Sequence, residues 1–205
     1  MSVSGLARYR SAIRITGVVL ALSGLLALQG CWVESMHGLS EAGWFNADKD
    51  QVYDPGLLGS WTVTIDKCSM TLNITAEGKA YNWRTTGVGE DCDKDSYYTA
   101  ELFKLDEHQF FDLTARPEDV CGMCRAVHWI FLAQIEKDSF SLTPIDSDAF
   151  KNAEANGTVK LSTIQDDSDT ITASAKELKA FCRKYAEDKE VFRPIPGFTF
   201  KRKQT

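Results

Sequence analysis

The stretch Ala126-Val-His-Trp-Ile-Phe-Leu-Ala-Gln-Ile-Glu136 decides the fold class of this chain. An apolar side chain stands at every second position, which is typical of a β-strand with one buried face. His128 alternates with these positions and is therefore expected on the outer face. The residues that share the buried face are Val127, Trp129, Phe131, Ala133 and Ile135. Residues 68–75 repeat the pattern, with a face made by Met70, Leu72 and Ile74. The sequence thus predicts a sheet with one apolar, buried face.

Runs of the same kind recur along the chain, rich in Val, Ile, Thr and aromatic residues and bounded by turn residues. They predict eight strands, at residues 60–66, 68–75, 79–86, 97–105, 109–115, 126–136, 139–144 and 158–164. Eight antiparallel strands can close into an up-and-down barrel that leaves no strand edge unpaired. The predicted fold is therefore mainly β, with one eight-stranded antiparallel barrel inside residues 57–205.

Two helices are expected beside the barrel. A short inserted helix begins after Asp146 or Ser147 and ends at Asn156-Gly157, where glycine permits a left-handed exit. A longer helix begins at Ser174, which forms a capping box with Glu177. Its apolar side, expected to pack on the barrel wall, is made by Leu178, Phe181, Cys182 and Tyr185. Phe198-Thr-Phe200 is a further candidate strand.

The N-terminal residues have the pattern of an export signal. Three arginines and no acidic residue precede an apolar run of 14 residues, Ile15 to Leu28. About 20 residues are needed to cross the hydrocarbon core of a bilayer, so a transmembrane anchor is the weaker alternative. A basic region, a short apolar region and small residues at the cleavage point are typical of a signal peptide. We therefore predict that residues 1–30 are removed.

The tetrapeptide Leu28-Gln29-Gly30-Cys31 resembles the bacterial lipobox. The resemblance implies cleavage before Cys31 and acylation of Cys31, which then anchors the chain in membrane lipid. A plain signal peptide cleaved elsewhere is the alternative. Trp32, rather than Asp, follows the cysteine. By resemblance to enteric lipoprotein sorting, this favours the outer membrane of a bacterial envelope, facing the periplasm.

Charge narrows the range of partners. Removal of residues 1–30 leaves 175 residues, enough for one domain with a sizeable core. Because the lost segment holds three arginines, 20 basic residues face 29 acidic ones in the mature chain. This excess argues against nucleic acid as a partner and against electrostatic adhesion to anionic lipid, so the acyl chains must supply the membrane affinity. Residues 31–56 show no sustained periodicity and are predicted to be a lipidated N-terminus and tether.

The stretch Leu57-Leu-Gly-Ser-Trp-Thr-Val63 resembles the Gly-x-Trp opening strand of lipocalins and lipocalin-like (calycin-type) domains. That resemblance implies that Trp61 plugs the closed end of the barrel. The segment Ile171-Thr-Ala-Ser-Ala-Lys-Glu-Leu-Lys-Ala-Phe181 also resembles the C-terminal helix of uncharacterised lipoproteins with a lipocalin-like body. Neither resemblance implies an activity or a cofactor.

The predicted strand directions place four cysteines at one end of the barrel. If successive strands alternate in direction, the linkers at 67–68, 87–96 and 116–125 lie at the same rim, which is the open mouth in lipocalins. These linkers carry Cys68, Cys92, Cys121 and Cys124. Cys182 lies on the apolar side of the last helix and is expected to be a small buried hydrophobic residue.

Three interpretations of this cysteine cluster are open. Two disulfides that staple the mouth loops are favoured, because an exported protein meets an oxidising compartment. The pairing is not decidable, although we lean towards Cys68 and Cys92 each pairing with one of Cys121 and Cys124. A structural zinc site with four thiolates is the second interpretation. A thiol-redox centre at Cys121-Gly-Met-Cys124 is the third, but a predicted strand follows it instead of the helix that would activate the first thiol.

Aromatic side chains are expected to line the barrel interior, namely Trp61, Tyr81, Trp83, Phe103, Phe110, Trp129 and Phe131. They can hold a small apolar ligand or simply fill the barrel, and a filled core is favoured. His37, His108 and His128 are scattered, and no Ser or Cys stands in a nucleophile-elbow context, so an enzyme has little support. The acidic loop 89–95 is expected to be solvated rather than calcium-binding. The predicted function is non-enzymatic binding of a small apolar ligand or an envelope protein.

Overall fold

The computed structural model describes most of the predicted domain. The described residues are 33–40, 48–65, 68–89, 95–115, 127–155, 157, 161–164 and 170–204. The predicted signal peptide and Cys31 lie outside them. Within these ranges, no helix is long and apolar enough to span a membrane.

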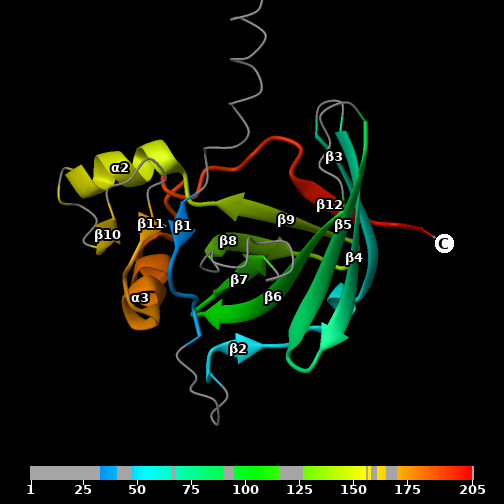
Figure 1. The fold of residues 1–205 in the computed structure, drawn as a ribbon, viewed down its shortest axis with the longest axis horizontal. Helices are drawn as coiled ribbons and strands as arrows, with labels where there is room; N and C mark the ends of the chain where they lie inside the picture. Colours follow the sequence, from blue (N-terminus) through cyan, green and yellow to red (C-terminus); the bar gives the residue numbers. More distant parts are fainter. Residues whose placement is uncertain are drawn as a thin grey trace, which may run out of the picture. The chain divides into compact units, whose positions relative to one another are not determined.

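Eight of the described strands close into an antiparallel barrel (Figure 1). Seven follow one another along the chain, each paired with the next, and the eighth joins the last of them to the first. They are β3 (Gly59–Ile65), β4 (Cys68–Glu77), β5 (Ala80–Val88), β6 (Ser96–Leu105), β7 (His108–Ala115), β8 (His128–Ile135), β9 (Ser139–Pro144) and β12 (Thr199–Arg202). The prediction of a mainly β, eight-stranded antiparallel barrel is confirmed.

The eighth strand of the barrel is not the predicted one. Residues 158–164 were expected to close it, but β12 does so, between β9 and β3. In β12, Phe200 is buried and its ring stacks on Phe140 with centroids 4.8 Å apart. Thr163–Ile164 forms only the two-residue strand β10, which pairs outside the barrel with β11 (Thr170–Ile171). The candidate strand at residues 198–200 is therefore the one that the barrel uses.

Both helices lie on one side of the barrel (Figure 1). These are α2 (Ser147–Ala155) and α3 (Ala175–Tyr185). The predicted capping box begins α3, since Ser174 Oγ accepts from the Glu177 amide and Glu177 Oε2 accepts from the Ser174 amide at 2.9 Å. The apolar side of α3 packs on the outer wall as predicted, in a core that contains Phe103, Phe110, Ile130, Leu178, Phe181 and Phe192.

The predicted tether is largely attached to the barrel. Residues 34–35 form β1 (Glu34–Ser35), which pairs with β8 and β11, and residues 51–52 form β2 (Gln51–Val52), which pairs with β6. A 3₁₀ turn, η1 (Pro55–Leu57), leads into the barrel. Val33 and Leu39 are 4% and 0% exposed. A free tether is therefore wrong for residues 33–40 and 48–56, because β1 and β2 pair with barrel strands and Val33 and Leu39 are buried in the core under the helices.

Candidate functional site

Trp61 closes one end of the barrel, as the lipocalin resemblance implies. The side chain is fully buried, and its indole N–H donates to Leu57 O at 2.8 Å. The guanidinium of Arg202 lies 4.1 Å from the centre of the ring and donates to the carbonyl oxygens of Leu58 and Gly56. The cation–π contact and these hydrogen bonds hold the indole in place at this end.

The middle of the barrel is filled with aromatic rings. Phe111 packs against Trp83 and Phe140 with ring centroids 4.8 and 6.3 Å away. Tyr81 is fully buried, its hydroxyl accepts from the Asp54 amide at 2.7 Å, and burial raises its pKa to about 12. Ring contacts this close leave no room for a ligand at the centre, so the interior below Trp83 is a core.

Two of the seven predicted lining residues face away from the interior. Phe103 and Phe110 oppose each other across β6 and β7 and belong to the core under the helices. Alternation along the two strands points Leu102 and Phe111 inward instead. The sequence analysis also missed Phe140 and Phe200. The signal for Phe111 was present in the sequence, because Leu113 lies two residues further on and shares its face.

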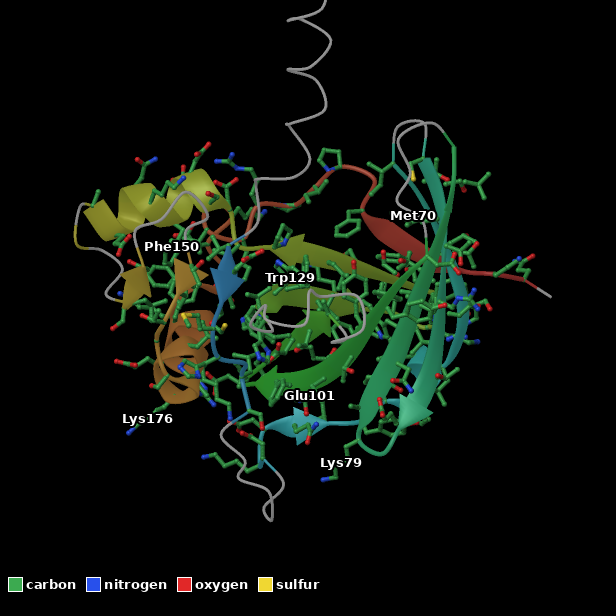
Figure 2. All side chains as sticks on the ribbon, in the orientation of Figure 1. Met70, Lys79, Glu101, Trp129, Phe150 and Lys176 are labelled. Carbon is green, nitrogen blue, oxygen red and sulfur yellow. The ribbon has the colours of Figure 1, made fainter. Side chains whose placement is uncertain are left out.

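The other end of the barrel is less closely packed. Met70, Tyr98 and Trp129 are only half-buried there, with the Tyr98 and Trp129 rings edge to face at 6.1 Å. Figure 2 shows Met70 towards this end and Lys79 at the opposite one. Thr85 and Ser96 pair across β5 and β6 at the same level and are also half-buried. We call these five residues the mouth.

Trp83 lies beneath the mouth with an unsatisfied polar atom. Its side chain is 3% exposed, and its indole N–H is buried without a hydrogen-bond partner in the described part of the chain. By contrast, the Trp61 indole N–H is satisfied. A buried N–H without an acceptor costs about 1–3 kcal/mol, so Trp83 marks a point where an acceptor oxygen would be stabilising.

Cys68 lies at the same end of the barrel as the mouth. The pairs of strand ends that flank the cysteine linkers meet at one rim, since β3 to β8 alternate in direction. Cys68 begins β4 at this rim. Cys92, Cys121, Cys124 and most of the acidic loop 89–95 lie outside the described residues. Cys182 is free and fully buried, and burial raises the pKa of its thiol, which agrees with a small hydrophobic role.

A second polar site lies on the outer wall, which the sequence analysis did not foresee. Asp112 is 1% exposed and accepts from His128 Nδ1 at 2.8 Å and from the Leu39 amide at 2.7 Å. Glu101 stands directly opposite Asp112 on β6 and accepts from Gln51 Nε2 at 2.7 Å, beside β2 (Figure 2). We call Glu101, Asp112 and His128 the acid–histidine cluster.

The pKa values of this cluster are displaced. Burial and the neighbouring charge of Asp112 raise the pKa of Glu101. Burial acts to lower the pKa of His128, but its hydrogen bond to Asp112 and the charges of Asp112 and Glu101 outweigh this and raise it. His128 faces outward, as the alternation predicts.

Lys179 on α3 forms a separate buried ion-pair network. It is 2% exposed and lies 2.8 Å from Asp48 and 2.9 Å from Asp50, which also meets Arg183 at 3.2 Å. Burial acts to lower the pKa of Lys179, but its hydrogen bonds to the two carboxylates outweigh this and raise it. These contacts join the chain ahead of β2 to α3.

Comparison with known proteins adds no family. The chain matches no family model, no curated protein and no solved structure. Among the described residues, no group of three or more His, Cys, Asp or Glu is arranged to hold a metal ion. His37 and His108 are apart from the acid–histidine cluster, His108 lying 3.8 Å from the exposed Glu187.

Proposed function

We propose that this chain is a lipid-anchored β-barrel protein of the bacterial envelope that binds a small apolar molecule at the mouth of the barrel. The observation that carries the proposal is the buried, unpaired indole N–H of Trp83 beneath the half-buried mouth residues. Binding there is non-enzymatic, because the mouth offers contacts and hydrogen bonds but no nucleophile paired with a base among the described residues.

The side chains of the mouth define the ligand class. Met70, Tyr98 and Trp129 offer apolar and aromatic contact, which favours a hydrocarbon body. The Trp83 N–H is a donor only, so its partner is a carbonyl or ether oxygen. The filled core below Trp83 limits how deep the ligand reaches. We therefore infer a ligand with a short apolar body and one acceptor oxygen at its inner end.

Two features outside the mouth belong to the proposal. Cys31 is acylated and fixes the chain to membrane lipid, most readily that of the outer membrane. Cys68 and Cys92 each pair with one of Cys121 and Cys124, so that disulfides staple the loops around the mouth. Disulfides are favoured over a zinc site with four thiolates or a redox centre at Cys121 and Cys124, because an exported protein meets an oxidising compartment. A stapled rim keeps the entrance preformed.

A matched pair of probes tests the binding site. The indole ¹H–¹⁵N signals of the protein are followed during titration with 2-nonanone and, separately, with nonane. We expect the ketone to shift the Trp83 signal most, and to bind about 5–10-fold more tightly than the alkane, because one hydrogen bond is worth roughly 1 kcal/mol. The variant Trp83→Phe should lose this preference while the barrel remains folded.

The control variant is Tyr53→Phe, at a half-exposed ring that stacks on Tyr81 far from the mouth along β5. It should bind both probes as the wild type does. If neither probe shifts the Trp83 signal, or if Trp83→Phe keeps the preference for the ketone, the mouth is not the binding site.

A further inference from the structure

The N-terminal segment 33–40 lies directly on the acid–histidine cluster. Leu39 is fully buried, and its amide donates to Asp112 Oδ2 at 2.7 Å. A Cβ at Gly38 would stand 2.3 Å from that same oxygen and 2.8 Å from the His128 ring, so only glycine permits this approach. The main chain of the segment therefore excludes water from the Asp112 carboxylate and covers part of the His128 ring, whose side chain remains 24% exposed.

The charges around His128 do not balance unless a proton is bound. Lys179 on α3 is the nearest buried cation, but it is held by Asp48 and Asp50. Two carboxylates, Glu101 and Asp112, then stand opposite each other on β6 and β7; Asp112 is hydrogen-bonded to His128, and the charges of both act on it. The charged groups that act on His128 are Asp112 and Glu101. From the elements around the cluster, the charge of Asp48 raises the pKa of Glu101, and the charge of Asp112 raises the pKa of the Cys182 thiol.

We propose that residues 33–40 act as a latch that closes over the acid–histidine cluster with uptake of a proton. When the segment is closed, water no longer screens the repulsion between the two carboxylates, so a proton on His128 or Glu101 stabilises the closed state. When the segment opens, water screens the charges and the proton is released. The latch is therefore held in mildly acidic solution and loosened in alkaline solution.

The direction follows from linkage. The pKa of His128 is raised above its ordinary 6.5 and that of Glu101 above its ordinary 4.5 in the closed state. A group with a raised pKa contributes its stability in full below the ordinary value and loses it as the pH rises through the raised value. The stability that His128 gives to the closed latch is therefore lost as the pH rises above 6.5. Asp50 acts in the opposite sense at low pH. Burial acts to raise its pKa, but its contacts with Lys179 and Arg183 outweigh this and lower it.

The latch has a consequence for membrane attachment, and this step rests on the proposed acylation of Cys31. Val33 is buried on the barrel only two residues after Cys31, so a closed latch holds the barrel within about 7 Å of its lipid, at roughly 3.5 Å per residue. An open latch releases residues 33–40 from the barrel and so lengthens the connection between the barrel and Cys31. The pH would then control how far the mouth stands from the membrane.

Amide hydrogen exchange of Leu39 tests the latch without any reference to lipid or ligand. Protection of this amide, corrected for the intrinsic exchange rate, is measured between pH 6 and pH 9, with the Leu72 amide in β4 as a report of global unfolding. We expect Leu39 protection to fall by up to about tenfold per pH unit above the pKa of His128, since one proton is linked to opening. Leu72 protection should not follow it.

The variants separate the proposal from a purely structural contact. His128→Gln should remove the pH dependence, and the matched control His108→Gln should keep it. Glu101→Gln should raise Leu39 protection at pH 9, whereas Glu107→Gln in the exposed turn should not. Constant protection across the range, or the same fall in His128→Gln, would overturn the latch. If His128→Gln fails to fold, an unchanged Leu39 in Glu101→Gln overturns it equally.

Discussion

Replacing Trp61 with alanine is expected to lower the free energy of unfolding by about 3–5 kcal/mol, the range for truncating a fully buried large aromatic residue. The indole fills the closed end against Phe140, with ring centroids 5.0 Å apart, and Arg202 covers its other side. The substitution leaves a cavity and also removes the donor to Leu57 O. Chemical denaturation monitored by far-UV circular dichroism measures the loss.

The matched control is Trp129→Ala at the mouth. Trp129 is half-buried and packs chiefly on Tyr98, so its truncation should cost about 1–2 kcal/mol, well below the cost at Trp61. Equal losses at the two positions would mean that the two ends of the barrel are packed alike. The distinction between a plugged end and a mouth would then be wrong.

Replacing Lys179 with methionine is the second change with a large expected effect, about 3–5 kcal/mol, because it leaves buried carboxylates without their cation. Asp48 and Asp50 are 2% and 15% exposed at their side chains, so water compensates little. The chain ahead of β2 should also detach from α3. Thermal unfolding and exchange of the Gln51 amide measure the two effects.

A double-mutant comparison isolates the ion pairs. In a background that carries Asp48→Asn and Asp50→Asn, Lys179→Met should cost much less than in the wild type, since no charge is then left unpaired. Lys176→Met is the control on the same helix, because Lys176 is exposed and points away from the barrel (Figure 2). A large loss in Lys176→Met, or additivity in the cycle, would contradict this account.

The barrel could be predicted wherever a strand is long enough to show its alternation. The seven consecutive strands lie within a few residues of their predicted bounds. The positions predicted to face the interior do so at Met70, Leu72, Ile74, Trp129, Phe131, Ala133 and Ile135. The role of Trp61 was implied by the resemblance of its short motif to lipocalins, and the capping box at Ser174 followed from a local pattern. These features depend on neighbours in sequence, which is why the sequence alone was sufficient.

The structural features that the sequence did not predict depend on tertiary contacts. β1, β2, β10 and β11 have two residues each, too few to show any period. The N-terminal segment is held by single contacts such as the Leu39 amide with Asp112, 73 residues away in sequence. The outward turn of Phe103 and Phe110 shows that an outer wall covered by a helix is as apolar as the interior.

Mass mapping of the mature protein without reduction tests the central claim, a lipid-anchored barrel with a stapled mouth, most directly. We predict that the first peptide begins at Cys31 and carries the mass of its acyl chains. We also predict that the peptide with Cys68 is linked to one that contains Cys121 or Cys124. A first peptide that begins elsewhere and has no acyl mass, or a free thiol at Cys68, would contradict the account.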